Sequence, residues 1–230
     1  LIRHVVDNGN FFEMRELYAS GLITGFARLD GWSVGVIGSD PMSKAGAMDG
    51  NAADKYTHFV DLCDTFNLPL LIFLDMPGFM LGSHAERIAT MRRGARALIA
   101  SAECQVPKIE FMVRKSYGVA ADAPNSIGLP DSINLRFGWP SGEWGGIPIE
   151  GGVAAAYRRE IEAADDPDAH REAIEERLLR LRSPFRAAHR GDVVDLIDPR
   201  ETRSLACRFV NLAQPKLREL AQRPKRAVRP

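Results

Sequence analysis

Two loops of this 230-residue chain carry the residue types that could do chemistry. One spans residues 75–82 and the other spans residues 114–122, and each leaves a short apolar stretch and enters a helical or small-residue stretch. Small residues at Gly78, Gly118 and Ala120 would let an oxygen of a ligand approach the backbone closely. Backbone N–H groups at the start of a helix stabilise developing negative charge. The pattern indicates an oxyanion hole, although glycines that only serve tight turns would produce it as well.

The sequence lacks the motifs of several common phosphate-binding, dinucleotide-binding and metal-binding sites. The sequence contains no GxxxxGK[ST] phosphate loop, no GxGxxG after a strand and no HExxH. The five histidines, at positions 4, 58, 84, 170 and 189, do not cluster at the spacings of metal ligands. The three cysteines, at positions 63, 104 and 207, include no CxxC pair, so they predict neither a zinc site nor a disulfide framework. They favour a reducing, intracellular setting.

The composition is typical of a folded protein, with 45% hydrophobic residues and 30 Lys plus Arg against 30 Asp plus Glu. A formal charge of zero argues against a nucleic-acid binder, which normally carries a basic face. The longest apolar run, residues 68–74, is far shorter than the roughly 20 residues of a membrane helix. The chain begins at Leu1 without a secretory signal, and the missing Met indicates a fragment or a processed chain.

Apolar periodicity predicts the elements that must position the two loops. Strands are expected at five places, residues 22–29, 32–37, 70–74, 109–113 and 133–137. A type I′ turn at Asp30-Gly31 joins the first two. Helices are expected at residues 51–66, 85–104, 167–181 and 199–212, and residues 138–152 read as a loop. In the second helix the apolar residues predicted to face the core are Ile88, Met91, Ala95, Leu98, Ile99 and Ala102.

The alternation of strand, loop and helix favours an α/β fold in which helices pack against a sheet. The chain shows no internal repeat. We therefore expect a single domain at residues 1–215, followed by a basic, flexible tail at residues 216–230.

An ordered series of short segments resembles a known family. The segments are residues 9–13, 45–49, 59–70, 75–79, 106–108 and 114–118, and residues 139–140, 183–188 and 195–203 extend the match. Each piece alone is weak, but the ordered series is specific. To about Leu212, the chain resembles the C-terminal half of the carboxyltransferase β subunit of biotin-dependent acyl-CoA carboxylases, the propionyl-CoA and acetyl-CoA carboxylase group.

The resemblance implies a crotonase-like (ClpP/crotonase) fold, a spiral of ββα units in which sheet packs against helices. It also implies partners, namely the N-terminal carboxyltransferase half that shares the site, the biotin carboxylase and biotin carrier subunits, and further copies in a homo-oligomer. Neither nucleic acid nor membrane is implied. An isolated half is expected to be inactive and to expose apolar surface that its partner covers. The implied location is cytoplasmic, or the mitochondrial matrix in a eukaryote.

The implied reaction moves CO₂ from carboxybiotin to the α-carbon of a short-chain acyl-CoA, such as propionyl-CoA or acetyl-CoA. Biotin arrives on a separate carrier domain and is itself the base, so this domain needs no metal and no catalytic His or carboxylate. The ureido oxygen of biotin and the thioester oxygen both gain negative charge, and each needs preorganised donors.

Site residues follow from the resemblance by position. The backbone around Val119 and Ala120 would form the donor pair, and Gly118 would allow the turn. Gly78 and Phe79 would shape the facing wall of a biotin or acyl site.

The same site would include Tyr117 and also Asp122, at an acidic position that shapes the acyl pocket. The chain departs from the usual Gly-Gly-Ala-Tyr of the family, because it reads Gly118-Val119-Ala120-Ala121. The amide of Val119 stays a usable donor only if that residue has negative φ, and the isopropyl group would narrow access. The loss of Tyr at position 121 should change the shape of the pocket.

Three alternatives stay open. The carboxyltransferase of a decarboxylating biotin enzyme would run the same transfer in reverse. A hydratase or isomerase on the same fold would need carboxylates near the thioester, for which Asp122, Glu86 and Glu150 are the candidates. A diverged assembly subunit that has lost catalysis is suggested by Val119.

Overall fold

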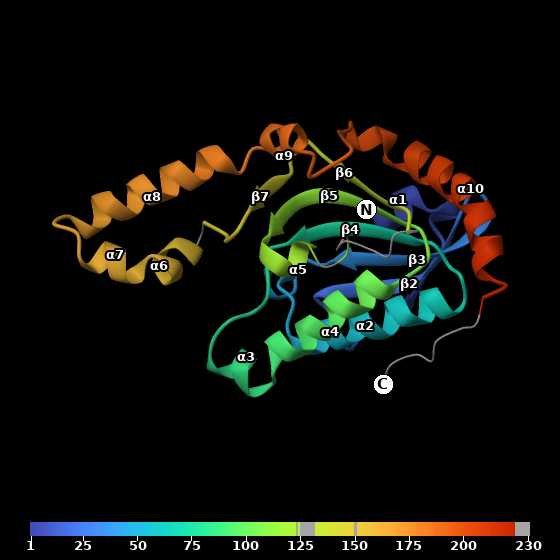
Figure 1. Cartoon of the computed structure of the whole chain (residues 1–230), viewed down its shortest axis with the longest axis horizontal. Coiled ribbons are helices and arrows are strands. Elements are labelled where there is room, and N and C mark those ends of the chain that lie inside the picture. Colours follow the sequence, from blue (N-terminus) through green and yellow to red (C-terminus); the bar gives the residue numbers. More distant parts are fainter. Residues whose placement is uncertain (123, 125–131, 150, 224–230) are drawn as a thin grey trace.

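One mixed sheet forms the centre of the protein (Figure 1). The computed structural model describes residues 1–122, 124, 132–149 and 151–223, and within them the strands run in the order β1-β2-β3-β4-β5-β6-β8, with β7 beside β5. Their bounds are β1 (Phe11–Met14), β2 (Leu22–Leu29), β3 (Trp32–Ser39), β4 (Leu70–Met76), β5 (Lys108–Tyr117), β6 (Asn134–Gly138), β7 (Glu143–Gly145) and β8 (Asp195–Leu196). β1 to β3 pair antiparallel and β3 to β6 pair parallel.

The five predicted strands are confirmed, and three short ones, β1, β7 and β8, were missed. β2 and β3 form the expected hairpin, in which Asp30 and Gly31 have φ of 49° and 80°, the positive values that a type I′ turn requires. β7 lies inside the predicted loop at residues 138–152, where it pairs with the end of β5. β8 has two residues and pairs with β6, so it is too short to leave a periodic signal.

Helices cover both faces of the sheet, as Figure 1 shows. α2 (Gly50–Thr65) and α4 (Thr90–Glu103) lie on one face, and α10 (Thr202–Leu220) lies on the other. Successive side chains of a strand point to opposite faces. Ile72 therefore belongs to the core under α2 and α4, while its neighbours Leu71 and Phe73 belong to the core under α10. Burial on both faces explains why β4 is continuously apolar.

The remaining helices have seven residues or fewer, apart from α8, which has 15 residues. They are α1 (Ile2–Val5), α3 (Ser83–Arg87), α5 (Gly118–Asp122), α6 (Gly152–Ala156), α7 (Arg158–Glu162), α8 (Pro167–Leu181) and α9 (Pro184–Arg190), with 3-10 turns η1 (Asp7–Gly9), η2 (Lys44–Gly46) and η4 (Pro199–Glu201). Across the described residues, we find no helix that combines the length and the apolar character needed to span a bilayer.

The helix predicted at residues 85–104 is two helices, and its predicted buried face is wrong. Ala89, in the left-handed conformation with φ 54°, separates α3 from α4. Met91 and Ile99 are 55% and 51% exposed, while the small residues Gly94 and Ala97 are buried.

The physical reason is shape. A Cβ at Gly94 would lie 2.5 Å from the ring of Phe79, so only the small-residue side of α4 fits against the protein. Ala95 is also exposed, and Ile88, Leu98 and Ala102 are half-buried. The apolar stripe of α4 therefore lies on the surface.

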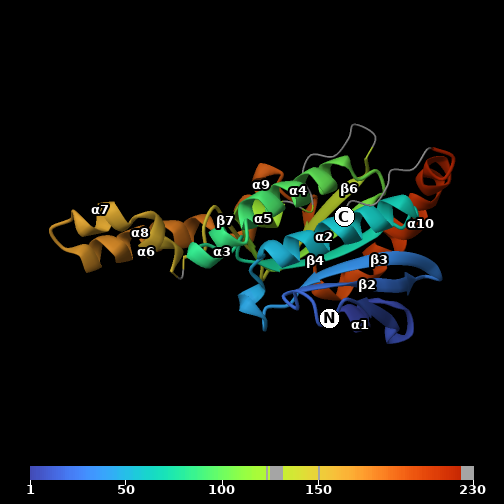
Figure 2. The same cartoon turned by 90° about the horizontal axis from the view of Figure 1, so that it is seen from below.

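An arm extends from the sheet beyond β7 (Figures 1 and 2). It consists of α6, α7 and α8, and its own small core contains Ile149, Val153 and Ile174. The predicted helix start is confirmed, because the side chain of Asp166 accepts a hydrogen bond from the amide of Ala169 and Pro167 follows directly.

The last helix is longer than predicted. α10 passes through Pro215 and ends at Leu220, so the predicted domain boundary at 215 falls inside a helix. Pro215 is exposed, whereas Leu217 and Leu220 are buried against the core and hold the final turns in place. Proline removes one helical hydrogen bond, which solvent can replace on an exposed face. Residues 216–220 are thus not a flexible tail, and residues 224–230 lie outside the described residues.

Candidate active site

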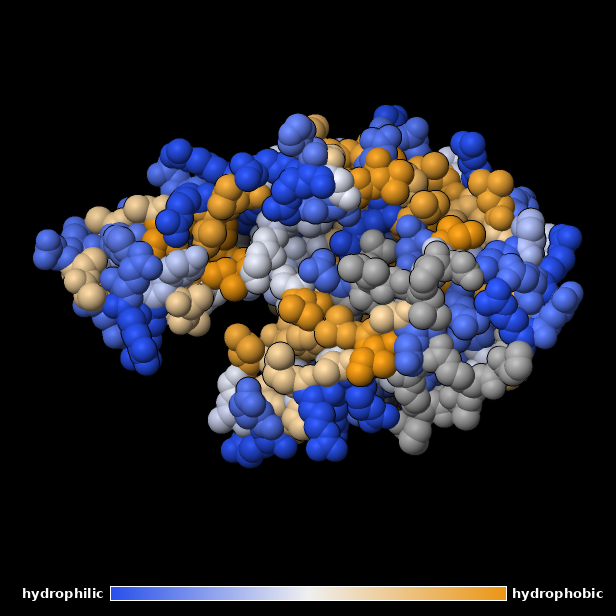
Figure 3. Space-filling view, viewed as in Figure 1, coloured by the Kyte–Doolittle hydropathy of each residue, from blue (hydrophilic) through white to orange (hydrophobic). Residues whose placement is uncertain are grey.

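A cavity of about 880 Å³ opens where β5 and β7 end. Figure 3 shows the surface hollowed between the arm and the part of the protein that contains α3 and α4. The wall combines the start of α5, the residues around β7, the arm and the strand β6. Predicted site residues in this wall are Tyr117, Gly118, Val119 and Asp122. Wall residues that sequence reasoning missed include Arg136, Trp144, Tyr157 and Arg182.

The start of α5 supplies backbone donors to this wall. Gly118 has φ +62°, and a Cβ there would lie 3.2 Å from the carbonyl oxygen of Gly146, so glycine is favoured on two grounds. The first amides of a helix have no carbonyl partner within it. Among the described residues no backbone acceptor is assigned to the amides of Val119 or Ala120. The N–H of Val119, which lies in the cavity wall, is therefore available to an anionic oxygen, whereas Ala120 is fully buried and does not line the cavity.

Val119 meets the condition set by the sequence. Its φ is not positive, since it is absent from the positive-φ residues and lies in α5, so the valine amide keeps a helical direction. Val119 is 55% exposed and lines the cavity, and the narrowing of access by its isopropyl group stays a prediction. Ala120 and Ala121 are buried and do not line the cavity, so position 121 contributes no aromatic ring to the wall.

Tyr117 is held rigidly beside these amides. Its hydroxyl donates a 2.9 Å hydrogen bond to Oε2 of Glu143 in β7, and Nη1 of Arg182 donates to the same oxygen at 3.2 Å. Burial raises the pKa of Tyr117 to about 12, and the hydrogen bond to the Glu143 carboxylate acts in the same direction. Tyr117 is therefore a neutral phenol at physiological pH.

Asp122 stands at the other end of α5 with its side chain 70% exposed. Nη1 of Arg136 lies 3.5 Å from its Oδ1. Arg136 is buried in β6, and its Nε donates a 2.8 Å hydrogen bond to Oε2 of the equally buried Glu110 in β5. Burial raises the pKa of Glu110, and the charge of Arg136 opposes that shift.

A sequence signal for this pair exists. Glu110 and Arg136 are charged residues of opposite sign inside two stretches predicted to be buried strands, where charges occur when they are paired. In the parallel register of β5 and β6 they stand side by side.

The loop after β4 lies beside this cavity without lining it. Gly78 has φ +124°, and a Cβ there would lie 3.5 Å from the carbonyl oxygen of Tyr117, so the two loops adjoin. The amide of Met48 donates to the carbonyl of Gly78 at 3.0 Å. Phe79 is half-buried and packs over Gly94 of α4. Neither Gly78 nor Phe79 belongs to the cavity wall, and their role in binding stays a prediction.

The carboxylates that a hydratase would need are not all near the cavity. Asp122 lies in the wall, whereas Glu86 is exposed on α3 and does not. Glu150 lies outside the described residues. Ser33 stands in a Gly-x-Ser-x-Gly sequence pattern, but it lies inside strand β3 rather than at the strand-to-helix turn that a serine nucleophile of that type requires.

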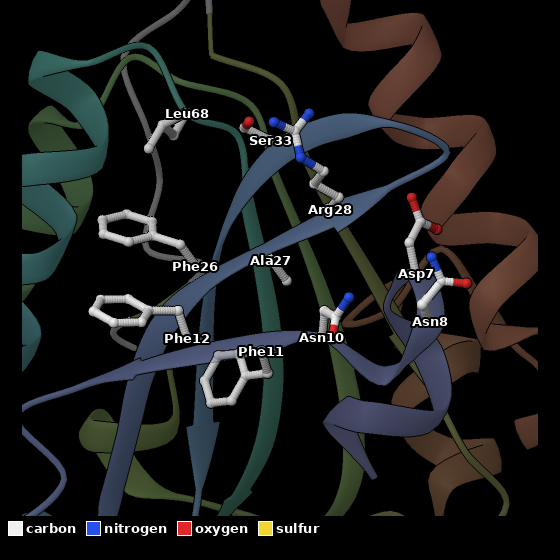
Figure 4. Close-up of a pocket in the computed structure, with 10 residues that line it drawn as sticks. All are labelled: Asp7, Asn8, Asn10, Phe11, Phe12, Phe26, Ala27, Arg28, Ser33 and Leu68. Carbon is white, nitrogen blue, oxygen red and sulfur yellow. The ribbon is translucent and has the colours of Figure 1, made fainter.

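A second groove of about 650 Å³ lies at the opposite edge of the sheet (Figure 4). Its wall is aromatic, with Phe11 and Phe12 of β1 next to Phe26 of β2. Its charged groups are occupied within the protein, since Asp7 accepts from the amide of Gly31 at 2.8 Å and Arg28 donates to the carbonyl of Gly31 at 2.8 Å. The first cavity is therefore the better candidate for the active site.

Comparisons with known proteins agree with this geometry. Residues 1–228 match the family described as "Carboxyl transferase domain". The chain is 42% identical over 205 residues to the propionyl-CoA carboxylase carboxyltransferase subunit of Haloferax mediterranei, covering 89% of this chain and 39% of that protein. It is also 42% identical over 204 residues to the methylmalonyl-CoA carboxyltransferase 12S subunit of Propionibacterium freudenreichii subsp. shermanii, covering 88% and 38%.

A solved structure gives the same result. The transcarboxylase 12S crystal structure, whose description names a hexamer assembly with methylmalonyl-coenzyme A and methylmalonic acid bound, superposes with a TM-score of 0.81 at 38% identity. It covers 100% of this chain and 42% of that one. The chain thus spans about two fifths of the length of these relatives. Its fold is crotonase-like, and the chain belongs to the carboxyl transferase domain family.

Proposed function

We propose that this chain is one half of a carboxyltransferase that moves CO₂ from carboxybiotin to the α-carbon of a short-chain acyl-CoA such as propionyl-CoA or acetyl-CoA. The observation that carries the proposal is the amide of Val119 in the first turn of α5, which lies in the cavity wall and, among the described residues, has no backbone acceptor outside its helix. The amide of the buried Ala120 is the second proposed donor. Family membership supports the proposal, and so does the presence of a cavity whose wall β5, β7 and the arm share.

The residues of the cavity fit the ureido ring of biotin or a thioester. Gly118 leaves space at the point where the backbone bends, because any Cβ would meet the carbonyl of Gly146. Carboxybiotin, attached to its separate carrier domain, supplies both the CO₂ and the base for this transfer. The amides of Val119 and Ala120 donate to whichever oxygen gains negative charge. Loss of one such donor typically lowers the rate by about 10² to 10³.

The neutral state of Tyr117 supports the same role. A phenol with a pKa of about 12 places no negative charge beside the donors at physiological pH. Asp122, on α5 itself, is an acidic side chain of this wall, and Arg136 opposes its charge. An oxyanion formed at the amides of α5 would therefore meet little repulsion.

The proposed partners are the N-terminal carboxyltransferase half, the biotin carboxylase and biotin carrier subunits, and further copies of the same subunit. The chain spans only about two fifths of its relatives, so other protein must complete the site. The exposed apolar residues Leu81, just before α3, and Met91 and Ile99, on α4, offer a surface for that half. Free thiols at all three cysteines support a reducing compartment, which we propose to be the cytoplasm or, in a eukaryote, the mitochondrial matrix.

The direct test is carboxylation by the whole subunit together with its biotin-carrying partners. Labelled bicarbonate and ATP are supplied with acetyl-CoA, propionyl-CoA or longer acyl-CoA thioesters, and the acid-stable carboxylated product is measured. Incorporation that avidin abolishes is the expected result. Absence of turnover with every thioester would refute the proposal.

A second candidate direction has a specific observation in its favour. The relative from Propionibacterium, as similar to this chain as the propionyl-CoA carboxylase subunit, is named for methylmalonyl-CoA, which is the carboxylated form of propionyl-CoA. The same donors would serve the transfer from a carboxylated acyl-CoA to biotin. Transfer of label from the carboxyl group of methylmalonyl-CoA to the biotin of the carrier subunit, without fixation of bicarbonate, would identify that direction.

A further inference from the structure

α5 must keep its donor amides still although it has only five residues, Gly118–Asp122. A helix of one turn is not stable by itself in water. Its amino end follows β5 directly, where Tyr117 pairs with Gly145 of β7, and its middle is fixed by the buried Ala120 and Ala121. The carboxyl end needs an anchor of its own, because a helix held at one end only can pivot.

Arg136 contacts that carboxyl end. Its side chain, on β6, reaches the last two residues of α5, with Nη2 3.5 Å from the carbonyl oxygen of Ala121 and Nη1 3.5 Å from Oδ1 of Asp122. Both contacts are long for hydrogen bonds. The third contact is strong, because Nε donates to Oε2 of Glu110 at 2.8 Å. One planar guanidinium therefore joins β5, β6 and α5.

Glu110 fixes the direction of this guanidinium. It is 1% exposed, Arg136 is 7% exposed, and the two stand opposite each other in the parallel register of β5 and β6. Within the described residues, the second oxygen of Glu110, Oε1, has no hydrogen-bond partner. A buried carboxylate that lost its hydrogen-bonded cation would be strongly unfavourable, so movement of Arg136 away from the sheet is costly. Its remaining two nitrogens are held toward α5.

A neighbouring contact anchors the residue that comes shortly after α5. Nζ of the buried Lys108, two residues before Glu110 on the same strand face, donates to Oγ of Ser101 at 3.0 Å, and that hydroxyl donates to the carbonyl of Pro124 at 3.1 Å. The same face of β5 thus secures the chain on both sides of the end of α5.

We propose that Arg136, fixed by Glu110, is a positioning residue for the donor amides: it ties the carboxyl end of α5 to the sheet and so sets the direction of the N–H groups of Val119 and Ala120. A buried ion pair is a poor source of stability, since apolar residues of similar size often serve as well. We therefore explain the ion pair by its effect on the position of α5 and not by a contribution to stability. The inference rests on the proposed function, because it assigns a purpose to the direction of those amides.

The test replaces the pair by apolar residues of similar size, Glu110→Leu with Arg136→Met, in the whole subunit assembled with its biotin-carrying partners. Displacement of a catalytic group by about 1 Å costs about 10² in rate, so kcat is expected to fall about 10²-fold. The KM for acyl-CoA should change little, because donors used only in the transition state contribute to kcat. The matched control is Arg180→Met, which breaks an exposed Arg–Glu pair with Glu176 on α8 and should leave kcat unchanged.

A second variant covers failure of the first to fold. Arg136→Lys keeps a cation beside Glu110, but a single ammonium cannot replace a planar fork that reaches two groups on α5. It should fold and still lose most of kcat. Amide hydrogen exchange of residues 118–122, compared with residues 70–76 of β4, should be faster in both variants than in the wild type.

Two results would overturn the proposal. One is a folded variant with wild-type kcat, and the other is unchanged exchange at residues 118–122. If the wild-type assembly itself turns over no thioester, the proposed function fails, and the exchange measurement alone then decides whether Arg136 anchors α5.

Discussion

Gly118→Ala tests most directly whether the backbone at the start of α5 does the chemistry. Alanine at φ +62° costs about 1–2 kcal/mol relative to a right-handed conformation, and its Cβ would stand 3.2 Å from the carbonyl oxygen of Gly146. We expect the unfolding free energy to fall by about 1–2 kcal/mol, which lowers the melting temperature by about 2–8 °C for a chain of this size. Relief of the strain must move the adjacent amide of Val119.

The expected effect on catalysis is larger than the effect on stability. A displacement of about 1 Å lowers kcat about 10²-fold, whereas binding of acyl-CoA should weaken much less. The assay is bicarbonate fixation by the assembled enzyme, with the melting temperature measured on the same preparation.

The matched control is Gly31→Ala in the hairpin turn. Gly31 has φ +80°, with nothing within 4 Å of an added Cβ, so it carries the same backbone strain without a contact near the cavity. It should cost similar stability and leave kcat at the wild-type value. If Gly118→Ala lost stability like Gly31→Ala and kept its full kcat, the amides of α5 would not be the donors.

Four more predictions concern the wall, its support and the titration of Tyr117. Val119→Ala removes part of the side chain that narrows the cavity, so the KM for larger acyl-CoA thioesters should fall; an unchanged KM across a chain-length series would contradict this. Gly94→Ala would place a Cβ 2.5 Å from the ring of Phe79, and overpacking of this kind should lower the unfolding free energy in urea by about 1–3 kcal/mol; an unaltered urea midpoint would show that the ring can move away. Glu143→Gln removes a carboxylate that raises the pKa of Tyr117, so that pKa should fall below about 12 in an ultraviolet titration of the phenolate. In the wild type the unfolding free energy should decrease as pH rises from about 10, the pKa of an unfolded tyrosine, toward about 12, because the unfolded phenol loses its proton first.

Local backbone structure was predictable where one or two adjacent residues determine it. Asp30-Gly31 specified a type I′ turn, and Asp166 followed by Pro167 specified a helix start, and both are present. The requirement for negative φ at Val119 is also met. In each case the neighbouring residues in the sequence contain the whole physical cause.

Packing was not predictable in the same way. Hydrophobic periodicity placed Met91 and Ile99 in the core, whereas the fit of Phe79 against Gly94 turned the small-residue side of α4 inward. Periodicity measures polarity and contains no information on shape. The ion pair of Glu110 and Arg136 was missed for a related reason, because its two members are 26 residues apart and meet only through the register of β5 and β6.

The arm has its own small core of Ile149, Val153 and Ile174, separate from the two larger clusters around the sheet. A segment whose apolar contacts are mostly internal can open locally at a lower free energy than the whole protein. The part of the cavity wall that the sheet forms should therefore unfold only with the whole protein, whereas the part that the arm forms can unfold first. Mild heating or a low concentration of denaturant should raise the KM for acyl-CoA while kcat stays unchanged. Thermal inactivation should therefore begin with weaker binding of the acyl group, and kcat should fall only later.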